Sequence, residues 1–288
     1  MSISAVIPAY NATSSLGLAI QSLRSCGIDD IIVVDDGSTD ATSSLALSLG
    51  ARLISQKNSG AYAARETGIH AAQTELVVLL DADDVVIPAG MKSAIRHIYS
   101  RPHLGCVAGQ VLLVGHDERP LPVWKKPATV ETLLALGYSP WPPAAAVWRR
   151  AALLDAVNME PPALRERYAD DYELLVRVAM RTGVEQLPIL TARYSISGGK
   201  STKSGDSDLA CAMRVREYYA RHCGVYVRRR SKAWVKSASD FRRASAATGH
   251  GRRREAFLFR LRATTRHPRY ATERLINAAM RIVRGKKL

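Results

Sequence analysis

The sequence predicts an α/β fold, in which a mostly parallel sheet is flanked by helices and followed by a basic helical C-terminal extension. Three observations support this prediction. Short apolar runs alternate with helical patterns through the first two thirds of the 288 residues. The runs are continuously apolar, as expected of strands that are covered on both faces. All of the excess positive charge lies after residue 211.

Six apolar runs, rich in Val, Ile and Leu, are the expected strands. They cover residues 4–8, 30–36, 51–55, 75–81, 106–114 and 185–197. Between the first two runs, apolar residues of 16–23 recur at i, i+3, i+4 and i+7, the spacing of one helix face. Further helices are expected over 38–50, which has capping residues and a closing glycine, over the alanine-rich 59–73, from Pro88 onward and over 167–180.

Two acidic clusters follow expected strands. Asp35 and Asp36 end the second strand, and Asp81, Asp83 and Asp84 end the fourth. Ligands of open α/β sheets bind beyond the carboxyl ends of the strands, so both clusters are expected at one binding crevice. Neighbouring carboxylates repel each other, which indicates a cation between them, and oxygen ligands suit Mg²⁺ or Mn²⁺. The alternative is a solvated acidic loop that caps the following helix.

The C-terminal region is strongly basic. Residues 1–211 contain 19 Lys and Arg against 22 Asp and Glu, whereas residues 212–288 contain 22 against 4. This asymmetry indicates a polyanionic partner, either an anionic membrane surface or nucleic acid. A stripe of apolar residues between Leu275 and Val283 is flanked by arginines and favours the membrane. Nucleic acid is less expected, because aromatic residues are sparse and no RNA-binding motif is present. The alternative is a helical cap that packs on the body.

Cysteine usage and hydropathy predict a cytoplasmic protein. The four cysteines have no CxxC spacing, so we expect reduced thiols and neither a disulfide framework nor a zinc site. The N-terminus begins directly on an expected strand and lacks the features of a signal peptide. No stretch approaches 18 uncharged apolar residues. Attachment to the membrane is therefore expected to be peripheral, at the inner face of the cell membrane.

The chain resembles the family-2 glycosyltransferases, which have the GT-A fold of nucleotide-diphospho-sugar transferases. The matching stretches stand in the family's order and at similar spacing, over roughly the first 200 residues. They are VIPAYN (6–11), IVVDDGSTDAT (32–42), NSGAYAARETGI (58–69), LLDADD (79–84) and DDYELLVR (170–177). The resemblance implies a catalytic domain over residues 1–204 and a separate basic helical region over 205–288.

The resemblance implies a site for the donor nucleotide at the ends of the first two strands. Pro8, Ala9 and Tyr10 would line the pocket for the base, with the Tyr10 ring against it. Asp36 would accept a hydrogen bond from the base, as suits uracil, and Asp35 would shape the loop. The alternative for the two aspartates is turn formation, since Asp-Asp-Gly-Ser is a good turn in its own right.

The resemblance also places donor-binding residues on the third helix and after the fourth strand. Arg65 would contact the nucleotide; a solvated surface arginine is the alternative. Asp81, Ala82 and Asp83 form the DxD motif, and Asp83 would reach the ribose or the metal. Asp83 and Asp84 are the expected ligands of Mg²⁺ or Mn²⁺, which stabilises the departing nucleoside diphosphate.

The catalytic base is expected at the start of the helix over 167–180. Asp171 matches the family's base, and Asp170 replaces the usual Glu on the acceptor side. An acidic N-terminal turn, favoured by the helix dipole, is the alternative. Trp141 is expected on the acceptor side, where its face would pack on a sugar ring. The Arg and His that family members often carry after the last strand are absent, because residues 194–197 read Tyr-Ser-Ile-Ser.

Together, these features predict an inverting glycosyltransferase. It would move a sugar from a nucleotide-diphosphate sugar, a UDP-sugar by preference, to a hydroxyl of a glycan or lipid-linked acceptor in cell-surface polysaccharide or glycoconjugate synthesis. Two alternatives remain. A nucleotidyltransferase would need a glycine-rich phosphate loop after the first strand, which PAYNATSS does not supply. A catalytically inactive GT-A-like protein would use the basic region to bind membrane or nucleic acid.

Overall fold

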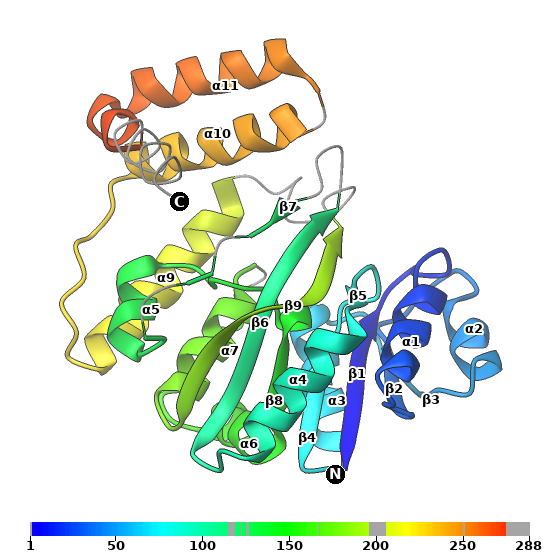
Figure 1. Ribbon diagram of the computed structural model, residues 1–288. Coiled ribbons are helices and arrows are strands. Elements are labelled where there is room, and N and C mark those ends of the chain that lie inside the picture. Colours follow the sequence, from blue (N-terminus) through cyan, green and yellow to red (C-terminus); the bar gives the residue numbers. More distant parts are fainter. Residues whose placement is uncertain are drawn as a thin grey trace.

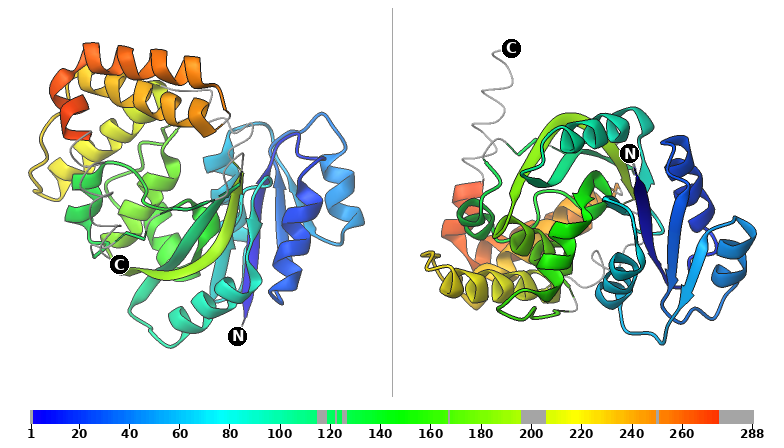
Figure 2. Two further views of the ribbon diagram at one scale, coloured as in Figure 1. Left: turned by 45° about the horizontal axis from the view of Figure 1, so that its top comes forward. Right: turned by 90° about the horizontal axis from the view of Figure 1, so that it is seen from below.

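The computed structural model describes residues 2–114, 119–121, 123–124, 127–166, 168–195, 206–249 and 251–274 (Figure 1). Within these residues the chain forms one nine-stranded sheet, in the order β3-β2-β1-β4-β8-β6-β9-β5, with β7 paired to β6. Helices lie on both faces of this curved sheet (Figure 2). The predicted α/β class is therefore confirmed.

Six strands of the sheet run in one direction. The first four are mutually parallel, and β6 is parallel to β9, whereas β5, β7 and β8 are antiparallel to their neighbours. The strands are β1 (Ile3–Ala9), β2 (Asp30–Asp35), β3 (Arg52–Ser55), β4 (Leu76–Leu79), β5 (Val85–Val86), β6 (Leu104–Val114), β7 (Arg119–Pro120), β8 (Ala146–Arg149) and β9 (Gly183–Ser195). All six predicted strands are present. The other three, β5, β7 and β8, were not predicted, because they are only two to four residues long.

The described helices match the predicted pattern and extend it. They are α1 (Leu16–Ser25), α2 (Thr42–Ser48), α3 (Ala61–Ala71), α4 (Pro88–Tyr99), α5 (Val130–Leu136), the 3-10 turn η1 (Pro143–Ala145), α6 (Arg150–Asn158), α7 (Asp170–Ala179), α9 (Asp206–His222), α10 (Lys232–Gly249) and α11 (Arg253–Arg266). Helix α2 begins later than residue 38, because Asp40 binds the backbone N–H of Thr42 and holds the preceding residues in a turn.

The core lies between the parallel strands and their helices. Every residue of β4 is fully buried, as expected of a central strand that is covered on both faces. Helix α3 packs so closely on β1 that a Cβ at Gly68 would lie 2.2 Å from Cγ1 of Val6. The glycine therefore allows a close contact, and this contact positions the Arg65 side chain of α3 beside the sheet edge.

Helix α7 is held in place by a buried polar network. The carboxylate of Glu173 accepts hydrogen bonds from the backbone N–H of Leu164 (2.7 Å) and from the hydroxyl of Tyr219 on α9 (2.8 Å). Arg177 is 1% exposed and donates to the carbonyls of Met159 (2.7 Å) and Pro161 (2.6 Å) and to the same hydroxyl (2.6 Å). The network ties α7, the segment before it and α9 into one unit.

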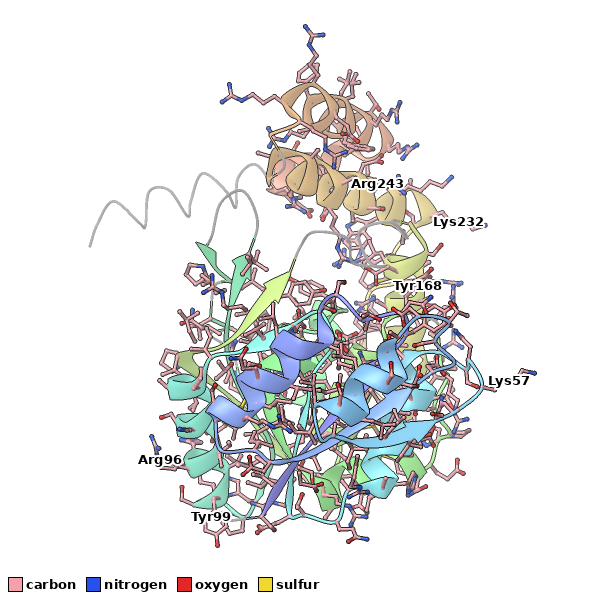
Figure 3. The ribbon with its side chains drawn as sticks, turned by 90° about the vertical axis from the view of Figure 1, so that its right-hand side faces the viewer. Lys57, Arg96, Tyr99, Tyr168, Lys232 and Arg243 are labelled. Atoms are coloured by element: carbon pink, nitrogen blue, oxygen red, sulfur yellow. The ribbon has the colours of Figure 1, made fainter. Side chains whose placement is uncertain are left out.

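The last two described helices form a hairpin at one end of the molecule, beyond α5 and α9 (Figures 1 and 3). Small residues fill the contact between α10 and α11, and Asp240 of α10, 1% exposed, pairs with Arg266 of α11. Helix α9 instead shares the core of the main body through Val215 and Tyr219. The division at residue 205 stays a prediction. The predicted apolar stripe between Leu275 and Val283 lies outside the described residues.

Candidate active site

The aspartates that follow β2 organise the crevice. Asp36 is buried, and its carboxylate accepts hydrogen bonds from the side-chain amide of Gln56 (2.9 Å) and the backbone N–H groups of Ser59 and Gly60 (both 2.8 Å). A carboxylate has about four acceptor positions, so Asp36 retains room for one further donor. It therefore joins the end of β2 to the start of α3 and could still bind a base.

Asp35 shapes the adjacent turn. Its carboxylate accepts hydrogen bonds from the backbone N–H of Ser38 (2.9 Å) and from the hydroxyl of Ser43. Burial raises the pKa of Asp35, but these hydrogen bonds outweigh burial and hold the pKa below its usual value. Gly37 has a φ of 76°, and a Cβ there would lie 3.0 Å from the backbone nitrogen of Asn58. The turn thus requires its glycine.

The residues that end β1 differ in what they can offer a nucleotide. Tyr10 is 41% exposed, so its ring is accessible from solvent. Pro8 is half-buried, and the Ala9 side chain is buried in the core. The Ala9 carbonyl accepts the backbone N–H of Asp36 (2.8 Å), which holds the first two loops together. Ala9 therefore acts through its backbone.

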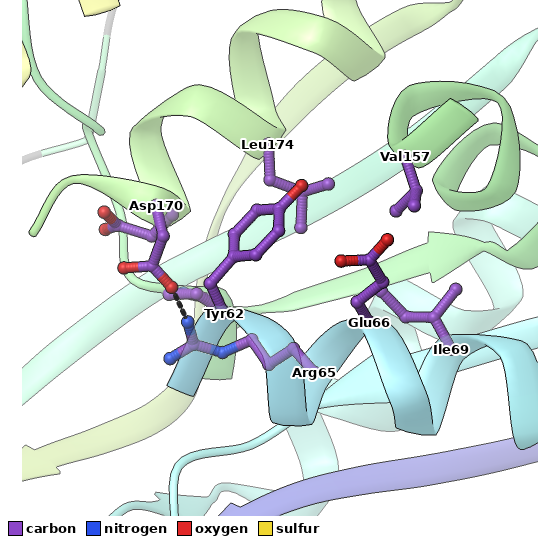
Figure 4. Close-up of a pocket in the computed structure, with 9 residues that line it drawn as sticks. Tyr62, Arg65, Glu66, Ile69, Val157, Asp170 and Leu174 are labelled. Atoms are coloured by element: carbon purple, nitrogen blue, oxygen red, sulfur yellow. Dashed lines mark hydrogen bonds and ion pairs between the residues drawn. The ribbon is translucent and has the colours of Figure 1, made fainter. Parts of the chain in front are cut away.

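Arg65 joins two carboxylates that lie far apart in the sequence. Its Nη2 donates to Oδ1 of Asp81 at 2.6 Å, and its Nη1 donates to Asp170 (Figure 4). Burial lowers the pKa of Arg65, but Asp81 and Asp170 outweigh burial and raise it, so the guanidinium stays charged. Arg65 is thus a buried bridge between the DxD motif and the start of α7, where the alternative was a solvated surface residue.

Asp171 follows Asp170 in the first turn of α7 and is half-buried. Burial and the charge of Asp170 raise the pKa of Asp171 to about 7, although Arg65 opposes them. A carboxyl group with this pKa exchanges protons near neutral pH, as a general base must. The preceding residue, Ala169, has a φ of 77°, a left-handed conformation that destabilises an alanine by roughly 1–3 kcal/mol. Such local strain is typical of functional sites.

A pocket opens beside this bridge (Figure 4). Its polar side is formed by Arg65, Asp170 and Asp171, and its apolar side includes Ile69 and Leu174. The remaining lining residues are Tyr62, Glu66, Pro143 and Val157. Tyr62 and Leu174 were not predicted, although both lie within stretches that carry the family resemblance. The site therefore combines a charged cluster with an apolar wall.

The DxD motif lies between β4 and β5. Ala82 and Asp84 are buried, whereas Asp83 is exposed. Among the described residues, no three His, Cys, Asp or Glu side chains are grouped as a metal site. Mg²⁺ needs only one or two carboxylates when substrate phosphates complete its shell, so the exposed Asp83 fits such a metal. Asp84 fits less well, because its side chain is 2% exposed.

The family model described as Glycosyl transferase family 2 matches residues 4–135. This part of the chain belongs to glycosyltransferase family 2. The match includes β1 to β4 and hence the loops that carry Asp36 and Asp83 and the helix that carries Arg65. Asp170 and Asp171 lie beyond the matched residues, so their place in the candidate site rests on the ion pair of Asp170 with Arg65.

Curated relatives resemble the same part of the chain. The putative glycosyltransferase EpsH of Bacillus subtilis is 32% identical over 101 residues, which are 33% of this chain and 29% of that protein. The succinoglycan biosynthesis protein ExoO of Rhizobium meliloti is 37% identical over 97 residues, which are 32% of this chain and 28% of that protein. The chain thus matches less than a third of the length of these relatives.

Solved structures confirm the GT-A fold. Staphylococcus aureus TarS 1–349, in complex with UDP-GlcNAc, has a TM-score of 0.62 at 20% identity, over 84% of this chain and 73% of that one. The mannosyltransferase PcManGT from Pyrobaculum calidifontis, in complex with GDP-Man and Mn²⁺, has a TM-score of 0.57 at 15% identity, over 98% of this chain and 80% of that one. At these identities the likeness shows the fold alone.

Trp141, which was expected on the acceptor side, does not lie at the surface of the candidate site. The ring is 2% exposed and belongs to the core, so its face is not accessible to a sugar in this structure. Trp148 is also buried, in β8. Large aromatic rings stabilise cores more than any other side chains, and one apolar Trp cannot be assigned to core or ligand from sequence alone. Asp170, likewise placed on the acceptor side, pairs with Arg65.

Proposed function

We propose that this protein is a metal-dependent, inverting glycosyltransferase. It would transfer a sugar from a nucleotide-diphosphate sugar, a UDP-sugar by preference, to a hydroxyl of a glycan or lipid-linked acceptor. The observation that carries this proposal is the bridge from Asp81 through Arg65 to Asp170. It joins the donor motif to the helix that bears the expected base, so both halves of the reaction share one site.

In this proposal Asp171 takes the proton of the acceptor hydroxyl as the new glycosidic bond forms. A carboxyl with a pKa of about 7 is deprotonated in half of the molecules at neutral pH and is more basic than an ordinary aspartate. Asp170 raises this pKa and Arg65 limits the rise. The pair therefore positions and tunes the base, while Asp171 alone handles the proton.

Asp83 is the proposed ligand of Mg²⁺ or Mn²⁺, with Asp84 behind it. When bound, the cation would stabilise the negative charge of the leaving nucleoside diphosphate. The exposure of Asp83 at the carboxyl end of β4 supports this assignment, and the Mn²⁺ complex of PcManGT is consistent with it.

The nucleobase would lie between the Tyr10 ring and the Asp36 loop. A uracil N–H would donate to the remaining acceptor position of Asp36. TarS binds UDP-GlcNAc and PcManGT binds GDP-Man, so the GT-A fold accepts more than one base. Our preference for UDP rests on Asp36. The name of ExoO, a succinoglycan biosynthesis protein, supports a role in polysaccharide synthesis.

We further propose that the α10–α11 hairpin binds an anionic membrane surface. Phe257, Leu258 and Leu261 of α11 are 64%, 52% and 52% exposed, and arginines surround them along the helix. Exposed apolar side chains within a basic helix face are typical of interfacial helices. No helix in the described part of the chain has the length and apolarity needed to cross a bilayer.

Thermal unfolding in the presence of UDP, GDP, dTDP and CDP, each with and without Mn²⁺, tests the proposed function. A ligand that binds the folded state raises the midpoint by mass action. We expect UDP with Mn²⁺ to give the largest rise and Asp83→Asn to abolish the dependence on Mn²⁺. If none of the four nucleotides raises the midpoint, the proposed function is wrong, and a binding protein becomes the better description.

A further inference from the structure

A second pocket lies between the main body and the C-terminal hairpin, and it shares no lining residue with the pocket beside Arg65. It has a volume of about 330 Å³ and is lined by residues of α5, α9 and α10 and by residues after α11. This volume lies within the range of small-molecule sites, roughly 300–1,000 Å³. Four arginines line it, and we call it the arginine pocket: Arg216, Arg230, Arg242 and Arg274.

The charge of the arginine pocket is poorly neutralised. Arg216 is 3% exposed and donates from Nε to the carbonyl of Leu134 (2.6 Å) and from Nη1 to that of Arg228 (3.0 Å). Within the described part of the chain it has no carboxylate partner, and no carboxylate lines the pocket. Burial and the nearby Arg230 lower the pKa of Arg216, and together they outweigh Tyr172 and Glu217, which raise it.

The chain itself supplies little charge to balance these arginines. Arg242 pairs with Asp208 at 3.1 Å, whereas no ion pair joins Arg230 to a carboxylate among the residues described. The segment that follows Arg274, residues 275–288, contains four Lys and Arg and neither Asp nor Glu. Its side chains therefore cannot neutralise the pocket, and we look to an external anion for the balancing charge.

Aromatic and apolar side chains complete the walls. Trp234 lies beneath Arg230, whose guanidinium carbon is 4.5 Å from the ring centroid, and Tyr270 packs against Trp234 with centroids 5.0 Å apart. Leu209 and Met213 of α9 add apolar surface. Guanidinium groups bind phosphate in a bidentate manner, and the aromatic wall suits an organic group attached to it.

We propose that the arginine pocket binds an organic phosphate, that is, a phosphate group joined to an apolar or aromatic body. The anion would lie between Arg216 and Arg230, and the body would contact Trp234. This site differs from the donor site in position and composition, because it has neither the Asp residues nor the metal ligands proposed there. Asp208, which pairs with Arg242, is also close enough to Asp171 to raise its pKa, so the two sites are neighbours.

Titration with phenyl phosphate, in EDTA and without nucleotide, tests this inference independently of the donor chemistry. We expect phenyl phosphate to bind more tightly than inorganic phosphate and to change the fluorescence of Trp234. Arg230→Gln should weaken binding by about fivefold or more, since it removes a charge-assisted contact. Arg229→Gln is the matched control, because Arg229 has the same charge, is 84% exposed and lies outside the pocket. It should change the affinity by less than about twofold.

The source of the phosphate is distinguished by a second arm with vesicles of phosphatidic acid or phosphatidylcholine. If only phosphatidic acid vesicles bind, and Arg230→Gln weakens this binding more than Arg229→Gln does, the ligand is a lipid headgroup. If phenyl phosphate binds with the same selectivity, a soluble organic phosphate suffices. Equal effects of the two substitutions, or no binding of either probe at about 10 mM phosphate, would overturn the proposal.

Discussion

Asp171 directly follows Asp170, whose carboxylate is already paired with Arg65. Arg65 pairs with Asp170 and with Asp81, so its charge is shared between two anions, and Asp171 is left with a raised pKa. The same three residues therefore connect the DxD motif to the start of α7 and set the proton affinity of the proposed base. Substitutions at these positions separate catalysis from folding.

Asp171→Asn should lower the rate of glycosyl transfer by about 10²–10⁴-fold, the usual contribution of a general base. The fold should remain, because the amide is isosteric and burial of the carboxylate is unfavourable. A raised folded-state pKa means that stability falls as pH rises from about 4 to about 7. Urea unfolding should thus show Asp171→Asn to be more stable than the wild type by roughly 1–3 kcal/mol at pH 8 and equal to it at pH 4.

The pH dependence of the rate should report the same carboxylate. Activity should fall about tenfold per pH unit below pH 7, because Asp171 must be deprotonated. Asp170→Asn should shift this acidic limb of the pH profile to lower pH. The substitution removes a neighbouring negative charge and leaves Arg65 less neutralised, and both changes lower the pKa of Asp171. A limb that stays in place in this variant would show that another group titrates.

At the scale of elements, α7 is the helix on which the site depends. Its first turn carries Asp170, Asp171 and the buried Glu173, and Arg177 follows one turn after Glu173; Glu173 and Arg177 bind the preceding segment and α9. These hydrogen bonds thus hold the start of the helix in place beside Arg65.

Arg177→Met should destabilise the fold by about 3 kcal/mol, because several buried carbonyl groups lose their donor. Arg181→Met is the control: Arg181 follows α7 and is exposed, so the change should stay within about 0.5 kcal/mol. Chemical denaturation measures both. Equal effects of the two substitutions would show that the buried network contributes little to stability.

For the whole molecule, the distribution of charge separates two working regions. Residues 1–211 are nearly neutral and contain the candidate active site, whereas the described hairpin combines arginines with the exposed apolar face of α11. Electrostatic attraction to an anionic surface weakens as salt screens it, and apolar insertion does not.

Flotation with vesicles that contain phosphatidylglycerol should recover the full-length protein, and recovery should decrease with added salt. Replacing Phe257, Leu258 and Leu261 together by Ser should reduce recovery several-fold even at low salt, because these side chains insert. The triple replacement of Leu18, Leu47 and Tyr99, exposed residues of the main body, is the control and should have little effect. Failure of the wild type to float would rule out the membrane proposal.

The sequence alone determined six of the strands, the helices between them, the resemblance to the family and the two acidic clusters at one edge of the sheet. Continuous runs of Val and Ile favour buried strands, and Asp-Asp-Gly-Ser turns form locally, so neighbouring residues were sufficient. Only the tertiary structure decided that Arg65 is a buried bridge rather than a surface residue, because its partners Asp81 and Asp170 lie 16 and 105 residues away. It also decided that Trp141 packs in the core and that four arginines of the basic region line one pocket. Such contacts depend on which helices pack together, and residue spacing along the chain carries no information about that.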